Sequence, residues 1–101
     1  MKRIELALGR NIPGGSTVSE GSMESFIHRH ILPRFNYGTF LDGHGLWKGE
    51  FERTKIFYIE CDDTDVSTLL PEFKVIAKKY KRRFRQNAVM VSVLETSTNF
   101  L

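Results

Sequence analysis

Several features that would assign a protein class are scarce or missing in this chain of 101 residues. Its single cysteine, Cys61, excludes an internal disulfide, so we expect a reducing, cytoplasmic environment. No apolar run approaches the roughly 20 residues that a membrane-spanning helix needs, and we expect no membrane partner. The N-terminus carries neither the apolar segment nor the cleavage site of a secretory signal. With three prolines and eight glycines, the composition also excludes a collagen-like or disordered chain.

No arrangement of histidine or cysteine matches a metal site. His28 and His30 are two residues apart, which places them about 200° apart on a helix, so they do not share a face. His44 lies in a predicted loop and Cys61 in a predicted strand, without the repeated spacing of zinc ligands. We therefore predict neither a metal nor a cofactor.

A glycine-rich segment at residues 9–16 has the spacing of a Walker A loop, but Gly15 occupies the position of the essential lysine. This absence excludes a nucleoside triphosphatase. A glycine-rich turn before a helix can still expose backbone N–H groups to an anion. The candidate ligand-binding residues here are Arg10, Gly14, Gly15 and Ser16, and the alternative is a purely structural turn.

What is present describes one domain over residues 1–101, because 41% of the residues are hydrophobic, 27% are charged and the net charge is +3. Period-two alternation predicts strands at residues 3–8 and 89–94. After the first strand, Ser19 is a good N-cap for a helix that Pro33 prevents from continuing.

Residues 37–61 return to period two and predict two further strands, with interruptions at residues 42–45 and 52–54. Acidic residues at 62–65 supply caps for a long second helix. Pro71 belongs to its first turns, and either a short turn precedes it or the helix starts after it. The apolar stripe of this helix consists of Leu69, Phe73, Ile76, Ala77, Tyr80 and Phe84.

The order βαββαβ predicts an α+β, ferredoxin-like fold: a four-stranded antiparallel sheet with two helices on one face. The strand that ends at Cys61 is apolar on both faces, with Phe57 and Ile59 on one and Ile56 and Tyr58 on the other. One pair faces the helices, and the other needs a cover that one subunit does not provide. We therefore expect self-association into a dimer or trimer.

Residues 42–50 contain three glycines, His44 and Trp47, which is more than a plain hairpin requires. A tryptophan can stack on the ring of a ligand, although filling the sheet face is the commoner outcome. The next strand carries Glu52 and Lys55, which could perform acid–base chemistry or form an exposed ion pair worth under about 1 kcal/mol. The candidate ligand-binding residues of this half are His44, Trp47, Glu52, Lys55 and Tyr58, and Glu52 is the one catalytic candidate.

Residues 78–85 hold six basic side chains. On a helix, Tyr80 and Phe84 point inward while the cations fan around the exposed side, which also complements the helix dipole. A nucleic-acid-binding module is our third hypothesis, but no aromatic pair typical of RNA-recognition motifs is present. We do not expect nucleic acid as the main partner.

A wider set of residues carries a family resemblance: Leu8-Gly9-Arg10, Pro13-Gly14-Gly15, Val18-Ser19-Glu20, Phe26, Pro33-Arg34-Phe35, Asp42, Gly45, Trp47, Glu52 with Thr54-Lys55, Tyr80, Phe84-Arg85-Gln86 and Val89. In these residues the chain resembles a family of short bacterial proteins known only as a domain of unknown function. Members of that family often have a signal or lipoprotein segment in front and a tryptophan at the place of Phe26, and this sequence has neither. The resemblance implies the domain and no reaction.

Two further similarities cover about half of the chain. Trp47-x-Gly49-Glu50, followed by a strand, a helix and a valine-rich strand, is similar to CutA and PII-type trimers, in which ligands sit in clefts between subunits. The same half, with Glu52 before Lys55 and Gln86-Asn87-Ala88-Val89 opening the last strand, is similar to phage S-adenosylmethionine lyases, which are trimers of related topology. Both similarities imply self-association.

The leading hypothesis is a homo-oligomer that binds a nucleotide-like or anionic metabolite at a subunit interface, as a sensor or a sequestering protein. A phage-encoded protein that sequesters nucleotide signals would fit this size. The alternative is a small enzyme of the S-adenosylmethionine-lyase kind, with Glu52 as its polar group and Trp47 or Tyr58 lining the ligand.

Overall fold

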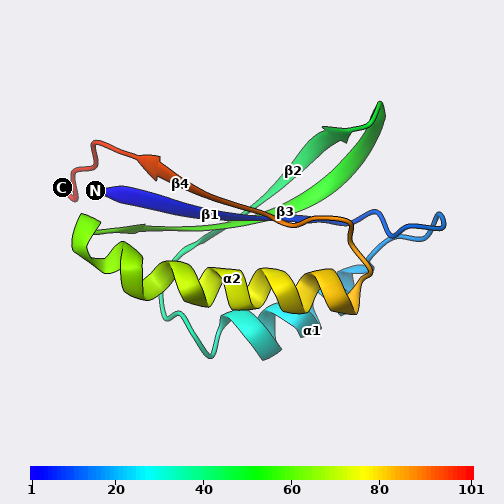
Figure 1. Cartoon of the computed structure of the whole chain (residues 1–101), viewed down its shortest axis with the longest axis horizontal. Helices are drawn as coiled ribbons and strands as arrows, with labels where there is room; N and C mark the ends of the chain where they lie inside the picture. Colours follow the sequence, from blue (N-terminus) through cyan, green and yellow to red (C-terminus); the bar gives the residue numbers. More distant parts are fainter.

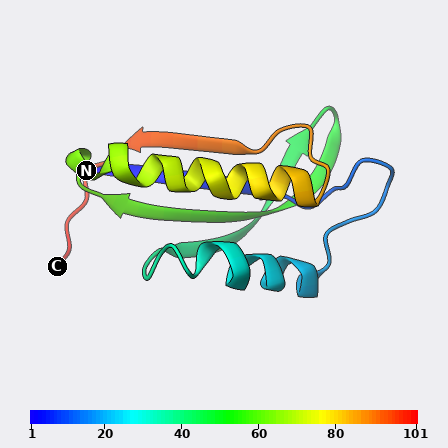
Figure 2. The same cartoon turned by 60° about the horizontal axis from the view of Figure 1, so that its bottom comes forward.

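A computed structural model describes all residues, 1–101, and has the predicted order of elements. These elements are β1 (Lys2–Gly9), α1 (Glu20–Phe26), the π-helical turn η1 (Ile27–Ile31), β2 (Thr39–Trp47), β3 (Glu50–Cys61), the 3-10 turn η2 (Asp63–Asp65), α2 (Val66–Arg83) and β4 (Met90–Glu95). The strands form one sheet in the order β2-β3-β1-β4, and all neighbours are antiparallel. Both helices lie on one face of this sheet (Figures 1 and 2), which confirms the ferredoxin-like α+β prediction.

The core lies between the sheet and the helices. Alternation in β1 turns Ile4, Leu6 and Leu8 toward the helices, and all three are fully buried. In β3 the buried pair is Phe57 and Ile59. Burial of each such side chain stabilises the fold by about 1.5–3 kcal/mol, so this layer outweighs any surface contact. The opposite face of the sheet is not covered by any element (Figure 1).

The first helix begins as its cap predicts. The Ser19 hydroxyl accepts a hydrogen bond from the Ser22 N–H at 3.1 Å. Val18 and Met23, on either side of this cap, are both buried, as in a hydrophobic staple. The helix then widens into η1, where the Leu32 N–H donates to the Ile27 carbonyl, and it ends before Pro33.

The second helix includes its proline. The turn η2 precedes α2, and Pro71 lies inside α2 near its start. The side of α2 that faces the sheet buries Phe73, Ile76 and Tyr80, as the stripe predicts. The Phe26 ring of α1 meets Tyr80 edge-on at 5.0 Å between centroids, which packs the two helices together.

The hairpin between β2 and β3 corrects one prediction. The expected interruptions at residues 42–45 and 52–54 are wrong, because both segments pair with each other in an unbroken ladder. The chain instead reverses in two residues, Lys48 and Gly49, with φ angles of 50° and 79°. Positive φ at both positions is the mark of a type I′ turn, whose twist matches that of the strands, so no longer loop is needed.

This turn generates a test of local stability. Lys48 is an unusual residue for a positive φ, whereas asparagine tolerates that conformation. Lys48→Asn should therefore raise the free energy of unfolding by a few tenths of a kcal/mol, and Gly49→Ala should lower it by about 1–2 kcal/mol. Urea denaturation measures both changes. As a control, Gly21→Ala lies in α1 with open space around its Cβ and should stabilise the protein by about 0.5–1 kcal/mol.

Candidate functional site

A cleft with a volume of about 810 Å³ lies on the uncovered face of the sheet. Three segments surround it: the loop between β1 and α1, the tip of the β2–β3 hairpin, and residues 86–88 before β4. In Figure 1 the hairpin rises above the uncovered face, and the β1–α1 loop extends from the same end of the molecule. The cleft therefore takes its walls from segments that are far apart in the sequence.

The floor of the cleft is almost free of side chains. Gly9 of β1 and Gly43 of β2 both pair with Thr54 of β3, one on either side, and Gly45 pairs with Glu52. A paired residue shares the face of its partner, so these glycines, with Ala7, leave backbone exposed on the cleft side. The result is a flat floor on which Glu52 and Thr54 are the larger side chains.

The carboxylate of Glu52 is held in place from one side. Its Oε2 accepts a hydrogen bond from the Asn11 N–H at 2.9 Å, while its Oε1 accepts none from the protein. The carboxylate lies directly over Gly9, since a Cβ added to that glycine would be 2.6 Å from Oε1. Glu52 thus presents one free carboxylate oxygen at the floor of the cleft.

The walls contain five of the predicted ligand-binding residues besides Glu52. Gly14, Gly15 and Ser16 come from the β1–α1 loop, and His44 and Trp47 come from the hairpin. Trp47 is 56% exposed, so a large part of its ring is open to contact. This indole can lie against a flat ligand that rests on the glycine floor.

In the loop between β1 and α1, the protein itself uses groups that an anion would need. Gly14 and Gly15 both have a φ of 104°, which explains why glycine stands at each position. The Gly15 N–H donates to the Ile12 carbonyl at 3.1 Å and so is not free to bind an anion. The start of α1 is likewise occupied, by its Ser19 cap and by the acidic Glu20.

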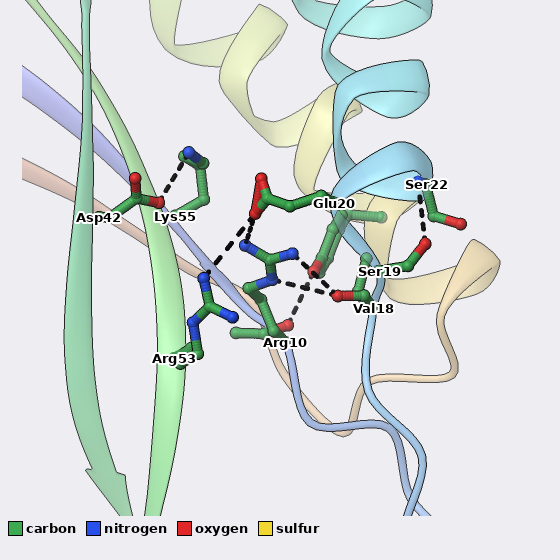
Figure 3. A network of polar contacts seen from close by, with 10 residues as sticks. Arg10, Val18, Ser19, Glu20, Ser22, Asp42, Arg53 and Lys55 are labelled. Carbon is green, nitrogen blue, oxygen red and sulfur yellow. Dashed lines mark hydrogen bonds and ion pairs between the residues drawn. The ribbon is translucent and has the colours of Figure 1, made fainter.

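Three predicted ligand-binding residues do not line the cleft: Arg10, Lys55 and Tyr58. Arg10 is 3% exposed and forms part of a polar network between α1 and the strands (Figure 3). Its Nε and Nη2 donate to the Val18 carbonyl at 3.1 and 3.0 Å, and its Nη1 pairs with Glu20 at 2.5 Å. Arg10 therefore ties the end of β1 to the start of α1.

The other two residues are also engaged. The Lys55 ammonium pairs with Asp42 at 2.7 Å in the same region (Figure 3), and this hydrogen bond lowers the pKa of Asp42. Tyr58 lies further along the uncovered face, where the Arg3 guanidinium is 4.1 Å from the centre of its ring. Like the pKa of Asp42 beside Lys55, the pKa of Glu20 is lowered, because Glu20 accepts a hydrogen bond from Arg10.

Many residues of the cleft were not predicted as ligand-binding, among them Ala7, Gly9, Asn11, Gly43, Gly45, Gln86 and Met90. Gly43 and Gly45 are two residues apart, and residues at that spacing in a strand lie on the same face of the sheet. Counting the ladder back from a turn at Lys48 and Gly49 would have placed Gly45 opposite Glu52. Asn11 and Gln86 carry no such signal, because they come together only in three dimensions.

The rest of the surface offers no comparable site. No group of three or more His, Cys, Asp or Glu side chains is placed to hold a metal ion. None of the helices is long and apolar enough to cross a membrane. The six basic side chains of residues 78–85 are exposed and none of them lines the cleft, while Tyr80 and Phe84 are buried as predicted.

Comparison with known proteins places this domain. A family model described as "Protein of unknown function (DUF3574)" matches residues 3–100. The chain belongs to this family. No curated protein matches the sequence.

Two solved structures share the fold over nearly the whole chain. One is a phage SAM lyase in its apo state, with 16% sequence identity, a TM-score of 0.66, and coverage of 92% of this chain and 78% of that chain. The other is a phage SAM lyase in complex with S-methyl-5′-thioadenosine, with 17% identity, a TM-score of 0.65, and coverage of 93% of this chain and 80% of that chain. The similarity to phage SAM lyases expected from the sequence is confirmed for the fold.

The Arg10 network generates a second prediction. Arg10→Ala should lower the free energy of unfolding by about 2–4 kcal/mol, because it leaves the buried Val18 carbonyl without its donors and opens a void. Arg53→Ala is the matched control, since Arg53 is exposed and 3.8 Å from Glu20; its cost should be under about 0.5 kcal/mol. Denaturation of both variants measures the difference, and equal costs would contradict the structural role of Arg10.

Proposed function

We propose that this protein binds a small nucleoside-like molecule in the glycine-floored cleft, with the free oxygen of Glu52 accepting from a cationic or hydrogen-bond-donating group. The observation that carries this proposal is a carboxylate fixed by one oxygen above a floor made largely of glycine backbone. A planar base can rest on such a floor and against Trp47. A volume of about 810 Å³ also lies within the range of small-molecule sites, about 300–1,000 Å³.

The charges of the lining favour a neutral or cationic ligand over a phosphate. Glu50 and Glu52 both line the cleft, against Lys48 as the only permanent cation. Arg10 and Lys55, the two cations among the predicted ligand-binding residues, pair with Glu20 and Asp42 instead. Of the two ligand classes predicted, nucleotide-like and anionic, a nucleoside without phosphate therefore fits best. A phage SAM lyase of the same fold in complex with S-methyl-5′-thioadenosine supports a ligand of this size.

We further propose that the protein acts as a sensor or sequestering protein and that a second copy covers the uncovered face. Besides Trp47, the exposed or half-buried large apolar side chains on this face include Leu41, Ile56, Met90 and Leu94. Ile56 and Met90 also line the cleft, so a partner on this face would lie next to the ligand.

The second candidate is an enzyme of the S-adenosylmethionine-lyase kind. The shared fold and the free oxygen of Glu52 favour it, because a carboxylate can stabilise a sulfonium or accept a proton. In such an enzyme the bond between sulfur and the amino-acid chain would break with its electron pair going to sulfur, which gives neutral S-methyl-5′-thioadenosine. The amino-acid chain would either close onto its own carboxylate as a lactone or lose a proton to Glu52 and gain a double bond. A sequestering protein would return its ligand unchanged after denaturation.

Glu52→Gln tests the role of this carboxylate, and a turnover assay on the same proteins separates the two functions. The amide keeps the shape and removes the charge, so the affinity for S-adenosylmethionine should fall by about 1.5–3 kcal/mol, or roughly 10- to 150-fold. The affinity for the uncharged S-methyl-5′-thioadenosine should fall less. Calorimetry measures both affinities, and mass spectrometry of the incubated S-adenosylmethionine detects turnover. Glu24→Gln, an exposed glutamate on α1, is the control and should change neither affinity.

Gly9→Ala provides an independent check on the same prediction. The new methyl group would occupy the position of the Glu52 carboxylate and push it from the floor. It should weaken the binding of S-adenosylmethionine as Glu52→Gln does. Unchanged affinity in both variants would remove Glu52 from the site, and no binding of either compound to the unaltered protein would contradict a site for these nucleosides.

Self-association is tested by light scattering. We expect a dimer or trimer at micromolar concentration, and Met90→Glu should dissociate it because it places a charge on the apolar face. Val75→Glu, an exposed apolar residue on the helical side, is the control and should leave the assembly intact. A stable monomer of 11.7 kDa in the unaltered protein would refute the assembly.

A further inference from the structure

The carboxylate of Glu52 is one end of a chain of hydrogen bonds that begins at the C-terminus of α2. The Gln86 side chain donates through Nε2 to the Asn11 carbonyl at 2.9 Å. The N–H of the same Asn11 donates to Glu52 at 2.9 Å, and its side-chain amide donates to the Phe51 carbonyl at 3.2 Å. Asn11 is thus hydrogen-bonded to the segment after α2 on one side and to β3 on the other.

The backbone after α2 aims Gln86 at this point. The Phe84 N–H donates to the Tyr80 carbonyl, and the Gln86 N–H donates to the Lys81 carbonyl, both at 3.0 Å. Between them Arg85 has a φ of 52°, the left-handed conformation that closes a helix and that glycine usually adopts. A non-glycine residue in this conformation is strained. The turn that it makes leads directly to Gln86 at the edge of the cleft.

The donors of the Gln86 amide are fully used. Besides the Asn11 carbonyl, Nε2 donates to the Phe84 carbonyl at 3.1 Å, which accounts for both of its hydrogens. These bonds fix the side chain to its own helix end and to Asn11. The Tyr80 hydroxyl of the same helix donates to the Gly9 carbonyl at 2.7 Å, so the chain is held on both sides of Arg10.

We propose that Gln86 is a positioning residue for the Glu52 site. Gln86 orients Asn11 so that its N–H meets Oε2 of Glu52, and Glu52 then keeps Oε1 directed to the ligand. This inference rests on the proposed function, since it assigns a purpose to the orientation of Glu52. It adds a residue that does not itself touch Glu52 and that acts through one backbone N–H.

Gln86→Glu tests this role, because the carboxylate has the same shape but repels the two carbonyls that Gln86 now joins. Hydrogen exchange of the Asn11 amide, followed by NMR, should become at least about tenfold faster, while exchange at Ile4 and Leu6 in β1 stays unchanged. The affinity for S-adenosylmethionine should fall about fivefold to twentyfold. Arg85→Gly is the matched control: it relieves the positive φ, keeps Gln86, and should leave the exchange and the affinity unchanged.

A double-mutant cycle separates positioning from a general loss of structure. If Gln86 acts through Glu52, adding Gln86→Glu to Glu52→Gln should cost no further affinity. Equal losses in both backgrounds, or unchanged exchange at Asn11, would overturn the proposal. Failure of the proposed function looks different: S-adenosylmethionine would not bind the unaltered protein. In that case the positioning role is refuted together with the site. The exchange rate of the Asn11 amide would then report only whether Gln86 holds Asn11 in place.

Discussion

The end of strand β1 is held from both sides of the sheet at a single residue, Gly9. On the helical side the Tyr80 hydroxyl donates to its carbonyl at 2.7 Å, and burial raises the pKa of this tyrosine, so it remains a donor. On the other side the Glu52 carboxylate occupies the space where a Cβ would lie. The helix, the central strand and the loop to α1 therefore meet at Gly9, where a larger side chain would displace the Glu52 carboxylate.

Neighbouring residues at this crossing have opposite roles because side chains alternate along an extended chain. Gly9 faces the cleft and leaves room for Glu52. Arg10, the next residue, turns into the space between β3 and α1, where it holds the Val18 carbonyl and Glu20. Structural stability and the candidate site are thus built from adjacent residues on opposite faces of one layer.

The uncovered face joins two proposed properties. The cleft occupies one end of it, where glycines replace side chains, and apolar residues such as Leu41 and Leu94 occupy the remainder. Away from the cleft, charges on this face pair internally: Arg3 bonds to Glu60 at 2.7 Å and covers Tyr58. Burial raises the pKa of Glu60, but hydrogen bonds from Thr96 and Arg3 outweigh it, so the net pKa lies below its usual value. A partner copy would therefore meet apolar area and satisfied charges beside the ligand.

The sequence by itself determined the order of elements, the face that β1 buries and the apolar stripe of α2. Periodicities of two and about 3.6 residues are local properties, and they showed that β3 is apolar on both faces. Only the structure decided that Phe57 and Ile59, and not Ile56 and Tyr58, face the core. The glycine-rich segment made Trp47 a candidate for the site now proposed, and the resemblances to known families singled out Glu52. The tertiary structure alone decided the two-residue turn at Lys48, since glycines inside a paired strand resemble a loop in sequence. It alone also separated Arg10 from the cleft and joined Gln86 to Asn11, because strand register and the direction of a helix end bring together residues that no local period relates.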